Sequence, residues 1–201
     1  MKKIFKNIFV GLFFLFLSSC AWLKSAPSDF LAEFKSKESY KPLKFFNMIH
    51  PELLAQGSKI LMPPFIPGEN VAATEECHKT ALMMVRGAYD AFQEKKSRWE
   101  IMTKENMERS DFIIEGRVVA WFEPSWFSRF FLRNKTKILK IEGKMIELDS
   151  GRAVAAFEDE IIAQRKEIFY RDLGYVLGAR LGNRIMMEDK MQKKEEPKGE
   201  K

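Results

Sequence analysis

Hydrophobic and polar residues follow different patterns along the chain and divide it into four stretches. Ten residues without a polar side chain, Ile8–Leu17, follow three lysines near the start. Residues 21–56 mix charges with several aromatics and show no clear period. From there to Met187, apolar residues recur at the spacings of strands and helices. Residues 188–201 are mostly charged, which predicts disorder because such a segment cannot bury enough apolar surface to fold.

Five segments are expected to be strands. Lys59–Met62 is typical of a buried strand and ends at Pro63 and Pro64, which lack the N–H that a central strand needs. Asp149-Ser150-Gly151 predicts a hairpin turn between the last two strands. The other predicted strands are residues 99–102, 111–122, 136–148 and 153–157, and within 111–122 we expect Phe112, Ile114, Val118, Ala120 and Phe122 to share one face.

Two segments are expected to be helices. Residues 70–93 have an apolar stripe at helical spacing, and Thr74 or Asn70 can cap its start. In residues 167–187, leucines and glycines each recur every four residues, so a ridge of small residues could lie close to a sheet or another helix, and we favour the sheet. The stripe consists of Leu82, Val85, Tyr89 and Phe92, with Cys77, Ala81, Met84 and Ala88 beside it. The ridge consists of Gly174, Gly178 and Gly182, and charged or polar residues such as Arg171, Asp172, Arg180, Asn183 and Arg184 exclude a membrane-spanning helix.

These elements predict one α/β (α+β) domain over residues 41–187. It should have a mixed sheet of about five strands with two main helices packed on it. The domain follows residues 20–40, which we interpret as a tether, and precedes the charged tail at 188–201.

The N-terminus has the pattern of a secretory signal. Lys2, Lys3 and Lys6 precede the apolar run, which is about half as long as the roughly 20 residues that cross a bilayer. Residues 1–19 are therefore expected to be a signal peptide.

The end of this run, Leu17-Ser18-Ser19-Cys20, resembles the lipobox of bacterial lipoproteins. The resemblance implies cleavage before Cys20 and acylation of its thiol and new amino group with fatty acids such as palmitate. Two or three acyl chains would hold the chain on a membrane, since each buried CH₂ contributes about 0.8 kcal/mol. Ala21 after the cysteine favours the periplasmic side of the outer membrane by the enterobacterial sorting rule. The alternative is an ordinary signal with a chance cysteine.

Composition narrows the possible partners. The chain has a net charge of +6, and the signal contributes three lysines, so the remainder carries only +3. This excess is spread along the chain and does not form the clustered basic face that binds nucleic acid. The second cysteine, Cys77, has no partner once Cys20 is acylated, and its helical context favours burial over an intermolecular disulfide.

Several of these segments together resemble a known family. They are the lipobox, the strand ILMPPF, the aspartate-led strand SDFIIEGRVVAWF, the hairpin IEGKMIELDSGRAVAAF and the glycine-rich last helix. Residues 57–187 are similar to the periplasmic domains of the CsgG, LpoB and TolB N-terminal-domain group of lipoproteins. The resemblance implies a component of envelope assembly or secretion complexes that is not an enzyme. It supplies no binding residue, and the chain lacks long amphipathic segments that could build a pore.

Catalytic, cofactor and metal motifs are absent from the sequence. It contains no phosphate-binding glycine loop, nucleophile elbow or zinc-binding HExxH. Cys77 and His78 are adjacent, so on a helix they point about 100° apart and cannot chelate one metal. The acidic groups Glu75-Glu76 and Glu158-Asp159-Glu160 are interpreted as solvated surface. We therefore expect no enzyme activity, cofactor or metal.

The most unusual stretch is residues 121–137, WFEPSWFSRFFLRNKTK, which connects two predicted strands. Such connections are normally polar and exposed. Here the aromatics could insert into a lipid interface, form a hot spot for a protein partner, or fold back as a short helix that closes the core. The residues assigned to partner or membrane contact are Trp121, Trp126, Phe127, Arg129, Phe130, Phe131 and Arg133.

Anchor, family resemblance and missing motifs together predict a lipid-anchored, non-catalytic scaffold or accessory subunit of a periplasmic or outer-membrane complex. The alternative is a transport-accessory lipoprotein that binds a lipid or other apolar ligand between helix and sheet. A scaffold predicts a filled core with an exposed patch, whereas the alternative predicts a large apolar cavity. A hydrolase would need an activated serine or cysteine in a cleft, and Cys77 is the one thiol left for that role.

Overall fold

A computed structural model describes residues 26–102, 108–122 and 136–195. The chain divides into two compact units, residues 1–36 and 37–201. Helix α2 (Ala26–Ser39) lies mostly in the first unit, where the rings of Phe30 and Phe34 stack with centroids 6.5 Å apart. The segment 20–40, which we expected to be a tether, is thus helical over much of its length.

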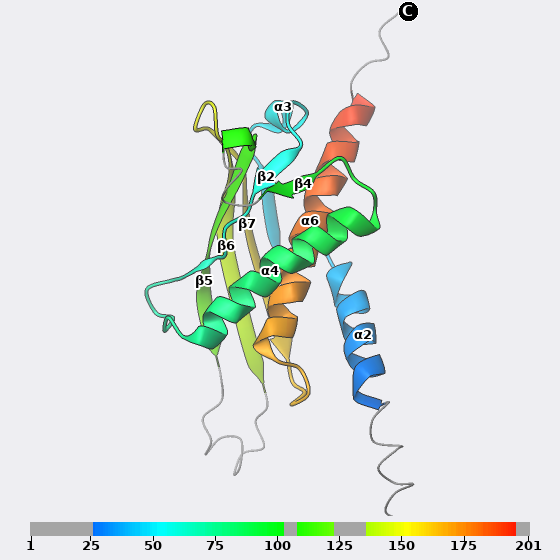
Figure 1. Ribbon diagram of the computed structural model, residues 1–201, viewed down its shortest axis with the longest axis vertical. Coiled ribbons are helices and arrows are strands. Elements are labelled where there is room, and N and C mark those ends of the chain that lie inside the picture. Colours follow the sequence, from blue (N-terminus) through cyan, green and yellow to red (C-terminus); the bar gives the residue numbers. More distant parts are fainter. Residues whose placement is uncertain (1–25, 103–107, 123–135, 196–201) are drawn as a thin grey trace, which may run out of the picture. The chain divides into compact units, whose positions relative to one another are not determined.

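One mixed sheet forms the second unit, and among the described residues it has seven strands (Figure 1). The strand order is β1–β7–β6–β5–β2–β4, with β3 also paired to β5. Strands β1, β7, β6 and β5 pair antiparallel, whereas β2 pairs parallel with β4 and β5 and β3 pairs parallel with β5. The strands are β1 (Phe45–Met48), β2 (Lys59–Leu61), β3 (Ile66–Pro67), β4 (Glu100–Met102), β5 (Phe112–Phe122), β6 (Lys137–Glu147) and β7 (Ala153–Ala163). The expected α/β class with a mixed sheet is confirmed, and the short strands β1 and β3 are additions to it.

Helices α4 (Glu75–Glu94) and α6 (Tyr170–Glu195) lie side by side on one face of this sheet (Figure 1). A short helix, α3 (Pro51–Leu54), follows β1. No described helix packs on the opposite face, which we call the open face. The core lies between the helices and the sheet, and its fully buried side chains include Phe92, Phe112, Ile114, Leu139, Ile141, Met145, Leu173 and Leu177.

Asp111, which begins the aspartate-led strand, joins β5 to β2. Its carboxylate accepts the backbone N–H groups of Ser58 and Lys59, with N–Oδ2 distances of 2.7 and 2.9 Å. Its own N–H donates to the Lys59 carbonyl at 2.9 Å. The aspartate at this position therefore has a structural role, because it satisfies backbone donors where β2 starts.

The glycine ridge of α6 packs against helix α4, whereas we favoured the sheet. A Cβ added at Gly178 would lie 1.9 Å from the Met84 carbonyl oxygen. Gly87 of α4 is equally crowded, since its Cβ would lie 2.0 Å from the Tyr175 carbonyl oxygen. Cβ atoms do not approach other atoms so closely, so these two helices meet backbone to backbone only because glycine occupies both positions.

Helix α4 buries part of the predicted stripe, namely Phe92 and the flanking residues Cys77, Ala81, Met84 and Ala88. Leu82 and Tyr89 of the expected stripe are exposed. Thr80, Gly87 and Ala91 are buried in addition, because α6 comes so close that small residues can fill the contact. Cys77 is buried and free, as expected, and Thr74 caps the helix by accepting the Cys77 N–H at 3.2 Å. The buried positions are Cys77, Thr80, Ala81, Met84, Gly87, Ala88, Ala91 and Phe92.

Helix α6 continues to Glu195, so part of the stretch 188–201 that we expected to be disordered is helical. The reason is that its first charges are paired. Asp189 is buried and binds Arg98, with 2.6 Å between Oδ1 and Nη2, and Glu188 pairs with Arg184 one turn earlier. The prediction based on charge alone therefore ended the folded unit too early in the sequence.

Candidate functional site

Most of the residues predicted for partner or membrane contact lie outside the described part of the chain. These are Trp126, Phe127, Arg129, Phe130, Phe131 and Arg133, and the predicted lipidation residue Cys20 also lies outside it. Trp121 is described, as are both ends of the aromatic connection. Strand β5 ends at Phe122 and β6 begins at Lys137, at the end of the sheet where α6 also starts (Figure 1).

A β-bulge determines the direction of Trp121. The register between β5 and β6 shifts between Val118 and Ala120, so one extra residue is inserted there. Trp121 consequently lies opposite the buried Leu139 on the helix-covered face. Phe122 points to the open face and is exposed. The expectation that Ala120 and Phe122 share one face with Phe112, Ile114 and Val118 was therefore wrong.

The ring of Trp121 packs against the first residue of α6. It stacks on Tyr170 with 3.9 Å between ring centroids and 19° between ring planes. The Tyr170 hydroxyl donates a hydrogen bond to the Phe122 carbonyl oxygen. These contacts tie the end of β5 to the start of α6, so Trp121 helps to fix the position from which the aromatic connection departs.

An apolar row crosses the open face beside this point. Phe122 on β5, Ile138 on β6 and Ile162 on β7 are consecutive cross-strand partners. Phe122 and Ile162 are exposed. Large apolar side chains at the surface are favourable sites for a partner, a ligand or a membrane.

The rest of the open face carries charges in cross-strand pairs. A depression of about 450 Å³ lies among them, lined by Ile66 of β3 and by β5 and β6. Each of these charges has an opposite partner, so the face has little net charge and does not present the basic cluster that binds nucleic acid. The pairs are Arg117–Glu142 at 2.6 Å, Lys144–Glu115 at 3.5 Å, Lys140–Glu158 at 2.9 Å and Lys44–Glu160 at 2.9 Å.

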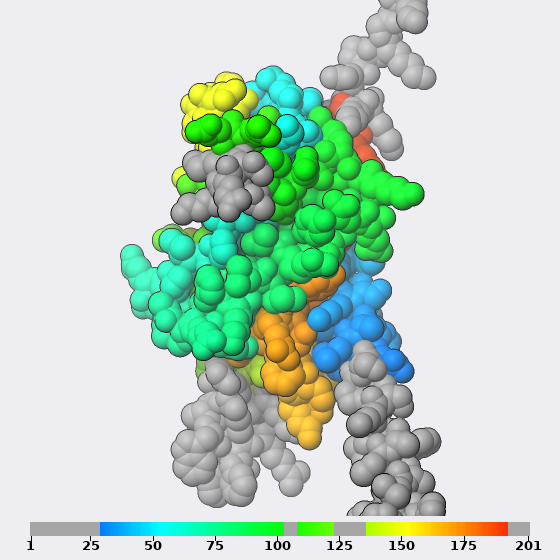
Figure 2. Space-filling view, viewed as in Figure 1, coloured from blue at the N-terminus to red at the C-terminus, as the bar shows by residue number. Residues whose placement is uncertain are grey.

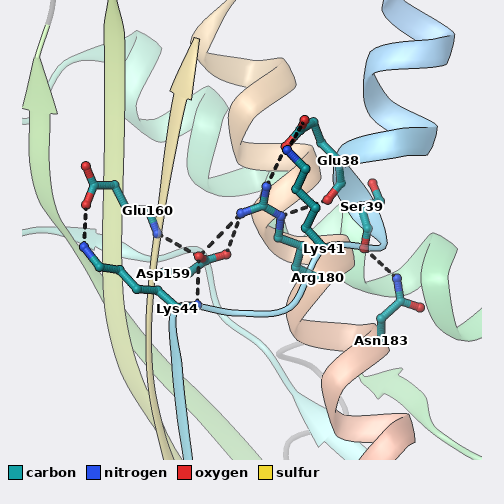
Figure 3. A network of polar contacts seen from close by, with 8 residues as sticks. All are labelled: Glu38, Ser39, Lys41, Lys44, Asp159, Glu160, Arg180 and Asn183. Atoms are coloured by element: carbon teal, nitrogen blue, oxygen red, sulfur yellow. Dashed lines mark hydrogen bonds and ion pairs between the residues drawn. The ribbon is translucent and has the colours of Figure 1, made fainter.

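A second group of polar residues centres on Arg180 of α6 (Figure 3). Its guanidinium donates to the Asp159 carboxylate at 3.1 Å, to the Glu38 carboxylate at 2.8 Å and to the Glu38 carbonyl at 2.9 Å. Asn183, one turn later, donates to the Ser39 carbonyl at 2.9 Å. Glu38 and Ser39 belong to the second unit and form the last turn of α2. Side chains of α6 therefore bind carbonyl groups at this helix end, where intrahelical partners are missing, and the Glu38 carbonyl also accepts the Lys41 N–H at 3.1 Å.

Asp159 corrects the expectation that the cluster Glu158-Asp159-Glu160 is solvated. Side chains alternate along a strand, so Glu158 and Glu160 face the open side while Asp159 faces the helices and is buried. Burial raises the pKa of the Asp159 carboxyl, although Arg180 and the N–H groups of Glu160 and Lys44 act in the opposite direction. The alternation within β7 was the signal that could have identified this residue.

The described residues offer no arrangement typical of catalysis. Among them, no three His, Cys, Asp or Glu side chains lie close enough together to hold a metal ion. Cys77 is buried, and burial raises the pKa of its thiol, which disfavours the reactive thiolate. In the part of the chain that the structure describes, no helix has an apolar stretch long enough to cross a bilayer.

Comparisons with known proteins reveal similarity of fold but not of sequence. No family model and no curated protein matches the chain. A variant of the PelC dodecamer from Paraburkholderia phytofirmans matches with a TM-score of 0.50 and 10% identity, over 71% of this chain and 96% of that one. The lipoprotein GNA1162 from Neisseria meningitidis matches with a TM-score of 0.40 and 11% identity, over 64% of this chain and 97% of that one. At these identities the similarity concerns the fold alone.

Proposed function

We propose that this chain is a lipid-anchored lipoprotein of the bacterial envelope, held by acyl chains on Cys20. In this proposal it is a non-catalytic scaffold or accessory subunit of a periplasmic or outer-membrane complex. The observation that carries the proposal is the open face of the sheet, on which no described helix packs and which combines paired charges with exposed apolar side chains at its margins. Phe45 on β1 and Ile66 on β3 are two of these exposed side chains.

The open face suits a protein partner for a physical reason. Its charged side chains are already held in cross-strand pairs, so ordering them on binding costs little additional entropy. A partner with complementary charges could bind across the pairs while its apolar groups cover Phe45 and Ile66. Charges at such a surface mainly determine which partner binds, and the apolar contacts supply more of the affinity.

The alternative, a carrier of a lipid or other apolar ligand, has less support. It requires a large apolar cavity between helices and sheet. The depression described above lies on the open face, and a second one of about 620 Å³ lies beside Arg180 and is lined by six charged residues with Pro42, Ile161 and Ile162. Between α4, α6 and the sheet, large side chains such as Phe92 and Phe112 are fully buried. The filled core favours the scaffold.

Site-specific photocrosslinking in cells would test the proposal. The probe replaces Ile66 on the open face, Trp126 in the aromatic connection, or Leu82, an exposed apolar residue of α4 that serves as the matched control. We expect a discrete protein adduct at Ile66 that is absent at Leu82. Identical adducts at both positions, or none at Ile66, would contradict a partner site on the open face.

The anchor needs its own experiment. We expect the chain to incorporate labelled palmitate in cells and the variant Cys20→Ser to incorporate none. Labelling that persists in the variant would refute the lipidation site. Because the PelC structure is described as a dodecamer, the assembly state of this chain should be measured on the same purified material.

A further inference from the structure

Exposed apolar residues and cations gather at the end of the sheet where β5 ends and α6 begins. Phe122, Ile162 and Phe169 leave 47%, 54% and 48% of their surfaces exposed. The connection between β7 and α6, residues 164–169, extends from this end (orange in Figures 1 and 2). We call the whole group the basal patch and define it as Phe122, Ile162, Phe169, Lys137, Arg165, Lys166 and Arg171.

The protein holds Phe169 at the surface through specific contacts. Its backbone N–H donates to the Asp172 carboxylate at 3.0 Å. The Lys137 ammonium lies 5.8 Å and the Arg171 guanidinium 5.0 Å from the centre of its ring. Lys137 also donates to the carbonyl oxygens of Arg165, Lys166 and Ile168. The exposed ring is therefore part of an ordered connection.

The charge of this connection is positive. Arg165, Lys166 and Arg171 are exposed, with Glu167 as the exposed acid between them. Asp172 is buried and caps the connection, so it contributes little to the surface. The start of α4 adds the pair Glu75–Lys79, whose charges cancel, and the exposed Glu76.

We propose that the basal patch is a second membrane contact that binds the headgroup region of a bilayer containing anionic phospholipid. Phe169, Phe122 and Ile162 enter the boundary between headgroups and acyl chains, while Arg165, Lys166 and Arg171 meet lipid phosphates. Aromatic and aliphatic side chains next to cations are typical of protein segments that bind the headgroup region of an anionic bilayer. The proposal rests on the lipid anchor, which keeps the chain at the bilayer, and adds an orientation that acyl chains on a single residue cannot impose.

A membrane fits this patch better than a folded protein does. The connection 164–169 projects from the molecule (Figure 2), whereas protein hot spots concentrate in packed, desolvated pockets. Cations around exposed rings can bind an anionic bilayer however the domain is rotated about the membrane normal. A partner surface of complementary shape is therefore not required. Each cation close to such a surface strengthens binding severalfold.

Spin-label accessibility on the full lipidated protein in vesicles would test this proposal. One label replaces Glu167 in the basal patch and another replaces Leu82 on α4 as the control. In vesicles of phosphatidylcholine and phosphatidylglycerol, we expect the label at 167 to become accessible to oxygen and protected from a water-soluble nickel complex. The label at 82 should stay accessible to nickel. Phosphatidylcholine alone should give a smaller change at 167.

Charge reversal supplies the matched comparison. Arg165→Glu combined with Lys166→Glu should reduce the protection of the label at 167 from the nickel complex by roughly tenfold or more. The reason is that two cations are lost and two anions gained. Lys95→Glu combined with Lys96→Glu makes the same change of charge in the exposed turn after α4 and should leave the protection unaltered. Equal effects of the two double variants would overturn the proposal.

Vesicle flotation in the same samples separates the two proposals. Protein that floats while the label at 167 remains open to nickel would overturn the basal contact and leave the lipid anchor intact. Protein that does not float would refute the anchor and the proposed function with it. Protection at 167 in native envelopes but not in vesicles would assign the patch to a protein partner and would also overturn the membrane contact.

Discussion

Arg180 of α6 and Asp159 of β7 form an ion pair inside the domain, with 3.1 Å between Nη1 and Oδ2 and only 5% and 2% of their side chains exposed. Glu38 joins them from the last turn of α2, so one guanidinium links three elements that are distant in the sequence (Figure 3). Buried charges of this kind are costly to desolvate and tolerate the loss of a partner poorly.

Replacing Arg180 should therefore destabilise the domain strongly. We expect Arg180→Met to lower the free energy of unfolding by about 3–5 kcal/mol, because Asp159 remains buried without its counter-ion. The control Arg117→Met breaks the exposed pair with Glu142 and should cost less than about 1 kcal/mol. Urea unfolding followed by circular dichroism measures both, and similar losses would contradict the distinction.

The pH dependence of stability should reveal Asp159. Burial raises its pKa in the folded state above the ordinary value of 3.8, so the folded chain holds this proton more tightly than the unfolded chain does. The stabilisation from this group is complete below the unfolded pKa and disappears as the pH rises through the folded pKa. The free energy of unfolding of the wild type, relative to Asp159→Asn, should therefore fall as the pH rises above the ordinary pKa of 3.8.

Comparison with Asp159→Asn separates the effect of Asp159 from that of groups whose contribution to stability changes with pH in the opposite direction. Lys140 lowers the pKa of Glu158, for example, and the resulting stabilisation is lost as the pH falls. A wild-type stability that rises with pH relative to Asp159→Asn would mean that Arg180, and not burial, dominates the titration of Asp159.

Replacing glycine by alanine in the contact between α4 and α6 should destabilise the domain by different amounts at different positions. Gly178→Ala would place a Cβ 1.9 Å from a backbone oxygen, so the helices must separate, and we expect a loss of about 3 kcal/mol or more. At Gly182 the corresponding distance is 3.1 Å, and the loss should stay near about 1 kcal/mol or below. Thermal unfolding of both variants tests this order, and a greater loss at Gly182 would refute the packing described here.

The bulge in β5 predicts different roles for two adjacent aromatics. Trp121→Ala removes the stack on Tyr170 and should cost about 2 kcal/mol of unfolding free energy. Phe122→Ala removes an exposed ring and should cost less than about 0.5 kcal/mol. If the second variant were the less stable one in urea unfolding, the bulge would have to lie elsewhere.

Periodicity identified the long elements of this fold because their buried residues repeat regularly. It overlooked β1 and β3, which have four and two residues and are too short to show a repeat. It also placed the exposed Leu82 and Tyr89 in the stripe of α4 and missed Thr80, Gly87 and Ala91, which are buried but carry little hydrophobic signal. Close backbone packing depends on the shape of both helices, which one sequence pattern does not contain.

The candidate sites were predictable to a smaller extent. Composition singled out the stretch beginning at Trp121 but could not show that an inserted residue in β5 turns this ring inward. The partners of Arg180 lie 21 and 142 positions away in the sequence, so only the folded arrangement brings them together. Phe169 could not be predicted, because a single aromatic residue in a charged connection gives no signal in the sequence that its ring is exposed.

The position of Glu38 and Ser39 also has a mechanical consequence. Tension applied to the N-terminal part of the chain enters the compact unit at Lys37 and is transmitted to α6 through the bonds of Arg180 and Asn183. From Arg180 it passes to β7, an inner strand of the sheet. A domain of this design would resist a pull on its N-terminal side with three side-chain bonds in parallel before the load reaches the sheet.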